Sequence, residues 1–529
     1  MIRVICSGRR PELRQIVSAA FRRSFGRDQV ILVSPAEWRR VLDGDTTVMI
    51  LVVEPLEDWR DLIRLTIAKP GSKLVVFGSL PPAVAQALGA RVGPIDSNLT
   101  AGAGCEPAPV CGFSESRLGI VYRKSLGDVA SPIPERAFLR FDYADEWNIL
   151  GFGAVRADNS AWSWSQTVEI PEHARLADVT YDGRTVSSYA GLWDYETASL
   201  LWFNRPVGPI DSQEWRLVEV FVSHHRYPDL SCSPCLSEIP YGFEAAVTMR
   251  LDCDEDVESA RPLWNFYSAT GLPFSLAVQT CLLDDRRHRG LLREVAQQGG
   301  AILSHTSTHM PNWGGSYHAA YIEATASAAK LAQIVGTRVR YAVSPFHQTP
   351  AYARAALVDA GYAGCIGGIV RDDPDFIMAR GGTVPGGPED FVGHSQQCML
   401  HGDPLLEGDD PIAVFKEAFE IARRGRALFG YLDHPFSLRY QYGWPDEETR
   451  LEMHRRFTSH LLSHDRLLFL NENDAMDFLR YRAAASVSKT DEGFIVVPSR
   501  SVLSQWTLAV EFGGRVVAAV EAGWQSWNC

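Results

Sequence analysis

The region from about residue 245 to 482 alternates short apolar strand patterns with longer helical patterns, and this alternation limits the available folds most strongly. Strands that alternate with helices form parallel sheets, because each helix returns the chain to the start of the next strand. We expect strands at 245–253, 274–278, 301–304, 340–343, 362–366, 391–400, 429–434 and 467–470. We expect helices at 258–268, 289–297, 317–335, 351–359, 411–423, 447–462 and 474–482. Seven or eight such units predict an α/β barrel, whose chemistry lies at the carboxyl ends of its strands.

A second, shorter alternation occupies the start of the chain. Strands are expected at 3–6, 29–33, 47–53 and 73–77, and helices at 12–23, 36–42, 59–67 and 83–88. This pattern predicts a small doubly wound parallel sheet of the Rossmann or receiver type. Ser7-Gly8-Arg9-Arg10 follows the first strand in place of a GxGxxG turn, and the third strand ends in Glu54-Pro55. We therefore expect no nucleotide or phosphoryl chemistry here, and a role in positioning or in binding a protein partner.

Four domains follow from these patterns: a Rossmann- or receiver-like domain at 1–95, a β-rich middle domain at 112–240, the barrel at 241–484 and a C-terminal β appendage at 485–529. Residues 89–112 are rich in Gly, Pro, Ala and Ser and predict a linker. In the middle region we expect a helix at 212–222 and short strands at 119–123, 137–141, 166–170 and 198–203. Its tryptophans, which we expect in the core rather than on a sugar-binding surface, are Trp147, Trp162, Trp164, Trp193 and Trp202.

Charge and hydropathy exclude several partners. The formal net charge is -13, with no basic block, which argues against nucleic acid and against an anionic membrane surface. No apolar run reaches the roughly 18 residues that a membrane span needs, and the start has no secretory signal pattern, so we expect a cytoplasmic protein. Most of the 10 cysteines lie in apolar segments such as those around Cys253, Cys281 and Cys365 and predict reduced packing residues. The lone pair Cys232 and Cys235 predicts a connector rather than a metal or redox site.

Two histidines four residues apart, His305 and His309, follow the apolar run Ala301–Leu303. A strand that ends at Ser304 delivers both imidazoles to the edge where barrels keep their active sites. Two imidazoles on one side of a turn can bind one divalent ion, but a carboxylate from elsewhere has to complete the site.

The segment 245–256 supplies such carboxylates. On a strand, Arg250, Asp252 and Asp254 share the polar face, while Val247, Met249, Leu251 and Cys253 share the apolar face. An acidic run of this kind is commonly a solvated turn or a helix cap. Its place before the two-histidine segment favours a functional reading instead.

These segments resemble the first two motifs of the NodB-type polysaccharide deacetylases, carbohydrate esterase family four, over residues 245–483. The resemblance implies a distorted (β/α)7 barrel in which Asp252 is the catalytic base and Asp254, His305 and His309 bind the metal. The segment Phe429–Pro435 looks like the late strand of that family, which ends in the general acid, here His434.

The chain departs from the family where an arginine usually orients the base, because Ser344 stands at that position. Arg250, on the predicted strand face of Asp252, is our candidate replacement. Asp256 stays open as a ligand in place of Asp254. Three further histidines are not assigned to the site: His347 is expected at the surface or the substrate rim, and His394 and His401 are expected to be structural.

The resemblance implies a metal-dependent hydrolase that removes N-acetyl groups from a carbohydrate, polymer or glycan intermediate. Zinc is the first candidate metal, and nickel, cobalt, iron and manganese stay open because two histidines and an aspartate discriminate poorly among them. Two alternatives also stay open: a cyclic-amide hydrolase of the allantoinase type, and a carbohydrate-binding or scaffold protein without turnover.

Overall fold

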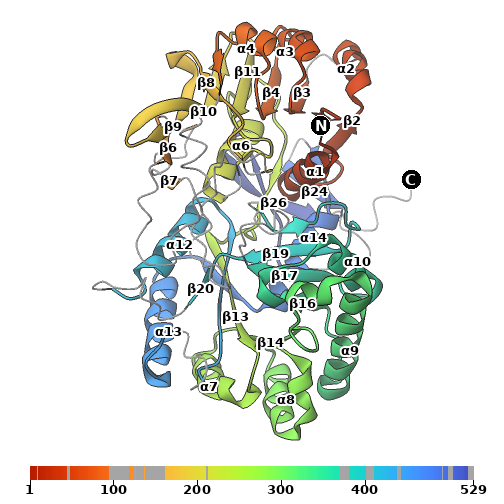
Figure 1. Ribbon diagram of the computed structural model, residues 1–529, viewed down its shortest axis with the longest axis vertical. Helices are drawn as coiled ribbons and strands as arrows, with labels where there is room; N and C mark the ends of the chain where they lie inside the picture. The colour runs from red at the N-terminus through yellow and green to blue at the C-terminus, as the bar shows by residue number, and fades with distance from the viewer. Residues whose placement is uncertain are drawn as a thin grey trace.

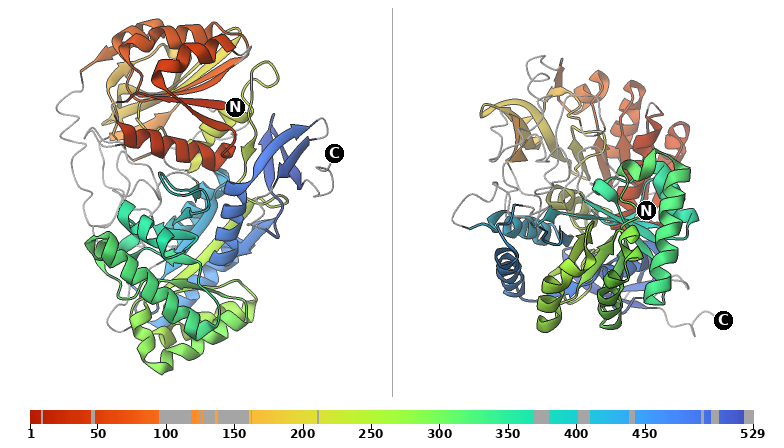
Figure 2. Two further views of the ribbon diagram at one scale, coloured as in Figure 1. Left: turned by 90° about the vertical axis from the view of Figure 1, so that its right-hand side faces the viewer. Right: turned by 60° about the horizontal axis from the view of Figure 1, so that its bottom comes forward.

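The computed structural model describes residues 1–8, 10–44, 48–94, 118–123, 126, 136–137, 161, 163–209, 212–368, 380–400, 410–437, 443–490, 493–497 and 504–521. Within these residues the chain is mixed α/β, with one large sheet formed by the N-terminal half and a second formed by the C-terminal half. Figure 1 shows the first sheet at the top and the second below it, and Figure 2 shows a smaller C-terminal sheet beside them.

The first sheet begins as predicted, with four parallel strands in the order β2-β1-β3-β4. The strands are β1 (Ile2–Cys6), β2 (Val30–Val33), β3 (Met49–Val53) and β4 (Ser72–Phe77), and the helices are α1 (Pro11–Phe25), α2 (Trp38–Gly44), α3 (Arg60–Ile67) and α4 (Pro82–Ala87). β3 and β4 are buried along their whole lengths, which explains why β3 is apolar throughout and β4 is apolar from Leu74 to Phe77.

The same sheet continues into the middle region, in contrast to the expected separation of 1–95 from 112–240. β11 (Ala198–Phe203) pairs in parallel with β4, and the sheet then runs antiparallel through β10 (Arg184–Asp194), β9 (Arg175–Tyr181), β6 (Leu118–Tyr122) and β7 (Arg136–Ala137). β11 completes the hydrogen bonds of β4, which would otherwise be an exposed edge. The two segments therefore share one nine-stranded sheet.

Two strands of this sheet, β9 and β10, are absent from the sequence prediction. β10 carries Ser187, Ser188 and Gly191, residues that are uncommon in strands, and its pairing with β9 shifts register. A short strand β5 (Arg91–Gly93) also pairs with β8 (Thr167–Glu169). The tryptophans Trp164, Trp193 and Trp202 are buried, as expected, whereas Trp147 and Trp162 lie outside the described residues.

The second sheet has the order β18-β19-β17-β16-β15-β14-β13-β21-β20, with β22 paired to β13. Its strands are β13 (Ala245–Cys253), β14 (Ser275–Val278), β15 (Ala301–Ser304), β16 (Tyr341–Val343), β17 (Gly364–Gly368), β18 (Gly382–Thr383), β19 (Val392–Gln396), β20 (Cys398–Met399), β21 (Leu428–Asp433) and β22 (Leu467–Leu470). All pairings except that of β18 are parallel. Because β19 pairs with β17 and β20 pairs with β21, the segment 392–399 joins the two sides of the sheet.

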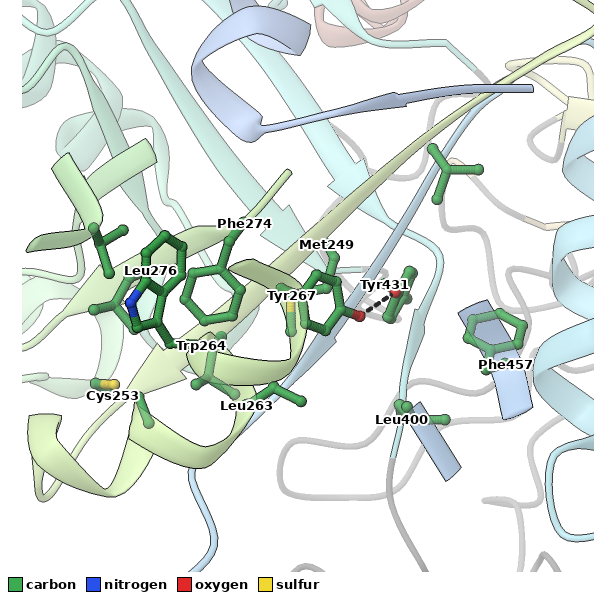
Figure 3. Close-up of a cluster of buried hydrophobic side chains, with 14 of the residues drawn as sticks. Met249, Cys253, Leu263, Trp264, Tyr267, Phe274, Leu276, Leu400, Tyr431 and Phe457 are labelled. Carbon is green, nitrogen blue, oxygen red and sulfur yellow. Dashed lines mark hydrogen bonds between the residues drawn. The ribbon is translucent and has the colours of Figure 1, made fainter. Parts of the chain in front are cut away.

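Helices lie close to the predicted positions. They are α7 (Arg261–Thr270), α8 (Arg289–Gln297), α9 (Tyr317–Val335), α10 (Ala351–Asp359), α12 (Ala413–Arg424), α13 (Glu447–Leu462) and α14 (Glu472–Ala484). Among them, α14 packs with Ala246, Ala277 and Leu303 on the face of the sheet opposite to the one that α7, α8, α12 and α13 cover. The core beneath them gathers side chains from β13, α7, β14 and β21 (Figure 3). Within it the hydroxyls of Tyr267 and Tyr431 form a hydrogen bond of 2.6 Å, so that two polar groups are buried without loss of hydrogen bonding.

The C-terminal strands β23 (Ser486–Thr490), β24 (Gly493–Val497), β25 (Ala509–Phe512) and β26 (Arg515–Glu521) form the expected β appendage. They are joined by β12 (Cys235–Leu236), which carries one cysteine of the CxxC pair, so the sheet has five strands. Cys281 is exposed, against the expectation that it packs in the core, because it lies in a 3-10 turn after β14. In the described part of the chain, no helix is long and apolar enough to cross a membrane.

Buried charges connect the three sheets. Glu219 on α6 (Ser212–Ser223) accepts two hydrogen bonds from Arg380, at 2.9 and 2.7 Å, and one of 2.7 Å from Ser24 on α1. Arg23 on α1 donates to the carbonyl groups of Arg380 and Thr383. Arg216 contacts both Glu219 and Glu511 of the C-terminal sheet. We name Arg23, Ser24, Arg216, Glu219 and Arg380 the Glu219 cluster.

Candidate metal centre and catalytic site

Strand β13 presents Arg250 and Asp252 on one face, two residues apart, as the alternation predicts. The Nε and Nη2 groups of Arg250 donate to the two carboxylate oxygens of Asp252, at 2.6 and 3.0 Å. Both side chains are almost completely buried. Burial alone would raise the pKa of Asp252, but Arg250 and then His305 outweigh it and hold that pKa below its usual value. Asp252 is therefore a fixed carboxylate rather than a carboxylic acid.

Asp254, His305 and His309 come together at the carboxyl ends of β13 and β15. The Oδ1 atom of Asp254 lies 3.2 Å from His305 Nε2 and 3.7 Å from His309 Nε2. The three side chains offer ligand atoms that all lie within 4.8 Å of one another. The structure thus brings together the three residues that the resemblance names as ligands.

The loop after β15 is held in place from three directions. The backbone N–H of His305 donates to Val278, and its ring Nδ1–H donates to the carbonyl of Val343 at 3.2 Å, which leaves Nε2 directed at Asp254. Glu323 on α9 accepts hydrogen bonds from the backbone N–H groups of Ser307 and Thr308 and from the Thr308 hydroxyl.

Two residues of this loop, Thr306 and His309, have positive φ angles of 61° and 54°. This conformation is unfavourable for residues with a Cβ atom, and at Thr306 a branched side chain adds to the cost. The Thr306 hydroxyl accepts a hydrogen bond from the backbone N–H of His309 at 2.9 Å. The surrounding hydrogen bonds hold the strained turn, which directs His309 back toward Asp254.

The electrostatics of the three side chains suit a cation. Burial would raise the pKa of Asp254, but His305 and His309 hold it well below its usual range. Burial and the neighbouring His305 lower the pKa of His309 to about 4. Burial would lower the pKa of His305 as well, yet Asp252 and Asp254 raise it, because the two carboxylates attract a positive charge at this ring. A divalent ion supplies such a positive charge.

His434 approaches the same carboxylate from the end of β21. Its Nε2 atom lies 3.6 Å from Asp254 Oδ2. The neighbouring Asp433 points the other way, as expected for adjacent residues of a strand, and binds Arg450 at 2.7 Å and His454 at 2.8 Å. Arg450 also donates to the backbone carbonyl of His434, and the backbone N–H of His434 donates to Asp433. Helix α13 therefore fixes the backbone that carries His434.

The segment that follows Ser344, where the resembling family has its arginine, packs against His309. Phe346 and His347 both have positive φ angles, and the ring of Phe346 lies 4.7 Å from that of His309. His347 is buried rather than at the surface, and burial followed by the charge of Arg250 lowers its pKa to about 3. Nothing in the sequence indicated that His347 would be buried near Arg250, because the segment around it lacks the arginine of the family motif.

The other candidate residues lie away from the ligand group. Asp256 caps the turn after β13, where it accepts a hydrogen bond from Glu258 N and contacts His288 at 3.2 Å, so it does not replace Asp254. Ser344 is buried and contacts Thr349 and Cys365. His394 is buried with its Nε2 3.4 Å from the Leu428 carbonyl, which fits a structural role, and His401 lies outside the described residues.

A hollow opens on the candidate site, and half of the residues that line it are acidic. It is lined by Asp252, Asp254, Glu255, Asp256, Ser259, His434, Pro435 and Ser437. The Ser437 hydroxyl donates to Glu255 at 2.8 Å and joins two sides of the rim. These two residues were not predicted from the sequence, because 182 positions separate them and neither belongs to a recognisable motif.

The donor set fits a divalent metal. Asp254 Oδ1 is buried and has no hydrogen-bond partner of standard geometry among the residues that the structure describes, although two imidazole nitrogens face it. Two imidazoles and one carboxylate are ligands that zinc and its first-row neighbours accept, with positions left for other ligands. Such a convergence of lone pairs is costly when nothing positive lies between them.

Comparison with known proteins gives no family for the chain. No family model matches the sequence, and no curated protein matches it. Among solved structures, a putative polysaccharide deacetylase from Mycobacterium smegmatis is 16% identical with a TM-score of 0.35, covering 46% of this chain and 92% of that one. Puue allantoinase is 14% identical with a TM-score of 0.36, covering 45% and 92%, and a probable polysaccharide deacetylase from Pseudomonas aeruginosa PAO1 is 13% identical with a TM-score of 0.34, covering 44% and 90%. All these TM-scores lie below 0.5 and all identities below 25%, so the likenesses assign neither a fold family nor an activity to this chain.

Proposed function

We propose that the chain is a metal-dependent hydrolase that removes N-acetyl groups from a carbohydrate, built on a seven-stranded NodB-like barrel. One observation carries the proposal: Asp254, His305 and His309 offer ligand atoms within 4.8 Å of one another, beside the buried Asp252 and a third histidine, His434, which both line the hollow. The joining of β17 and β21 through the segment 392–399 supports closure of the barrel.

Asp252 is suited to act as the general base. Its carboxylate lines the hollow, and Arg250 keeps it ionised and in one orientation. A base held in this way can take a proton from an attacking water without first having to rotate into place.

His434 is suited to protonate the departing nitrogen. An amide nitrogen is a poor leaving group until it receives a proton, so hydrolysis needs an acid on the side opposite the base. His434 lies on the same hollow as Asp252 and is held by its backbone through Arg450 and Asp433.

Asp254, His305 and His309 would hold the metal, with zinc as the first candidate. A divalent ion at this position would supply Lewis acidity for the activation of water and for the polarisation of the acetyl carbonyl.

The test is acetate release by the purified full chain, loaded with zinc, nickel, cobalt, iron or manganese, from a panel of N-acetylhexosamine oligomers. Allantoin serves as a cyclic-amide arm of the panel, and His434→Gln as the variant that should lose turnover while it keeps its metal. Release of acetate that His434→Gln abolishes supports the proposal. Turnover of allantoin alone would favour the cyclic-amide hydrolase instead. Sugar binding without turnover would favour the carbohydrate-binding or scaffold protein.

A further inference from the structure

A second group of metal-ligand side chains lies between α12 and α13, away from the candidate catalytic site. It consists of Glu420 on α12, His460 on α13, and His464 in the turn after α13. Figure 1 shows these two helices side by side on the outer surface of the lower sheet. As in the catalytic group, the ligand atoms all lie within 4.8 Å of one another.

The hydrogen bonds of His464 fix its tautomer. Its Nδ1 lies 3.0 Å from the His460 carbonyl and 3.3 Å from the Leu461 carbonyl, and only an N–H can donate to these oxygens. The proton of a neutral ring is therefore on Nδ1, and Nε2 has a lone pair. This Nε2 lies 2.8 Å from Glu420 Oε1, which also carries lone pairs. Two lone pairs at this distance need a positive charge between them, either a proton or a metal ion.

The surroundings of His460 distinguish a shared proton from a bound metal ion. The Nε2 atom of His460 is buried and has no hydrogen-bond partner in the part of the chain that the structure describes. A proton shared by Glu420 and His464 leaves that nitrogen unsatisfied, whereas a metal ion can bind all three side chains. Burial, and then His464, lower the pKa of His460 below its usual value.

The surroundings hold the three side chains in place. Arg423 donates to the other oxygen of Glu420, at 3.0 and 2.8 Å, which orients the carboxylate and leaves Oε1 for a second partner. The ring of Phe419 contacts both imidazoles, with centroids 6.1 Å from His460 and 4.9 Å from His464. The apolar ring of Phe419 therefore covers one side of the site.

We propose that Glu420, His460 and His464 form a second divalent-metal site, of the zinc type, that fastens the carboxyl end of α13 to α12. Donor atoms around a tetrahedral zinc lie roughly 3.4 Å apart, so binding requires Glu420 and His464 to separate by about half an ångström. His464 lies in the turn that follows α13 and is held against the end of that helix by its bond to the His460 carbonyl.

The proposed role is structural. Helix α13 also carries Arg450 and His454, which hold Asp433 next to His434. His460 lies six residues beyond His454, roughly 9 Å along the helix axis. A metal at the far end of α13 would restrict its movement without touching the hollow of the catalytic site.

The test is metal counting on the purified full chain, dialysed after exposure to zinc, for wild type, Glu420→Gln, His464→Gln and the double variant His460→Gln/His464→Gln. Glu417→Gln on an exposed position of the same helix is the matched control. Each variant of the site should bind one zinc ion fewer than wild type and should lose the zinc-dependent rise in Tm that this site gives. Glu417→Gln should bind as many ions as wild type.

The design separates this site from the catalytic one. His305→Ala/His309→Ala should also bind one ion fewer, and combining it with His464→Gln should remove both. Unchanged zinc stoichiometry in Glu420→Gln and in His460→Gln/His464→Gln would overturn the proposal and leave a simple ion pair between Glu420 and His464. That result would leave the proposed function intact, because the catalytic ligands are counted separately.

Discussion

Arg250 binds the carboxylate of Asp252 through two hydrogen bonds from a position two residues earlier on the same strand. The proposed base and the cation that orients it both come from one element, β13, so their geometry depends on the pitch of a single strand. Ser344, where the resembling family has its arginine, has no part in this pair.

Replacing Arg250 should damage catalysis and stability together. Arg250→Gln leaves a buried, unpaired carboxylate, so we expect turnover to fall by about 10²-fold and the free energy of unfolding to fall by about 3–5 kcal/mol. Arg250→Gln/Asp252→Asn removes both charges and should recover most of the stability but none of the turnover. The measurements are denaturant unfolding and acetate release. If the loss of turnover in Arg250→Gln/Asp252→Asn equals the product of the losses in Arg250→Gln and in Asp252→Asn, the two residues act independently and Arg250 acts elsewhere.

Restoring the arginine of the family at Ser344 should not help. Ser344 is 1% exposed and lies against Thr349 and Cys365, so Ser344→Arg forces a large cation into filled space. We expect a lower Tm and no gain in turnover, with Ser344→Ala as the control that keeps the space. A soluble Ser344→Arg variant with higher kcat would mean that Arg250 is an incomplete substitute.

Loss of a proposed catalytic ligand should remove the metal without destabilising the fold. His309→Ala should remove one bound ion and abolish turnover while Tm in the presence of a chelator stays close to that of wild type, because His309 lies in a loop at the strand end. His318→Ala, an exposed histidine on α9, is the matched control. An unchanged metal count in His309→Ala would contradict the ligand assignment.

The Glu219 cluster should make stability depend on acid pH. Burial would raise the pKa of Glu219, but Arg380 and Arg216 lower it from 4.5 to about 2. Since the folded pKa lies below the unfolded one, the cluster stabilises fully above pH 4.5, and this contribution, about 3 kcal/mol, is lost as the pH falls toward 2. Glu219→Gln should be less stable at pH 7 and lose less on acidification, as measured by urea unfolding. Glu452→Gln, which removes an exposed ion pair with Arg455, is the control and should show the same pH dependence of stability as wild type. The same pH dependence in Glu219→Gln would contradict the prediction.

Deleting residues 1–94 should prevent folding rather than leave an active barrel. The deletion removes β1 to β4, which pair with β11, and takes Arg23 and Ser24 from the Glu219 cluster. The expected outcome is an insoluble product or one that unfolds without a cooperative transition, measured by circular dichroism and calorimetry. A soluble truncation with native-like melting would show that the two halves of the first sheet fold apart.

The sequence predicted most of the second sheet because its strands are apolar and its helices are periodic, and both patterns are local. It also placed Arg250, Asp252 and Asp254 on one face, since strand alternation is a geometric rule. It did not predict the joining of β4 to β11, which depends on pairing across more than 100 residues, nor the irregular strand β10 with its serines and glycine. Nor did it reveal the second group at Glu420, because a carboxylate on one helix, a histidine at the end of another and a histidine in the following turn share no motif.

The Glu219 cluster also limits how such a chain can change over time. Arg380 belongs to the second sheet region, Glu219 to α6 and Arg23 to α1, and each is buried where water cannot replace a missing partner. A barrel transferred to another protein without α1 and α6 would lose the carboxylate that binds Arg380 through two hydrogen bonds. The barrel and the first sheet are therefore expected to depend on each other for stability.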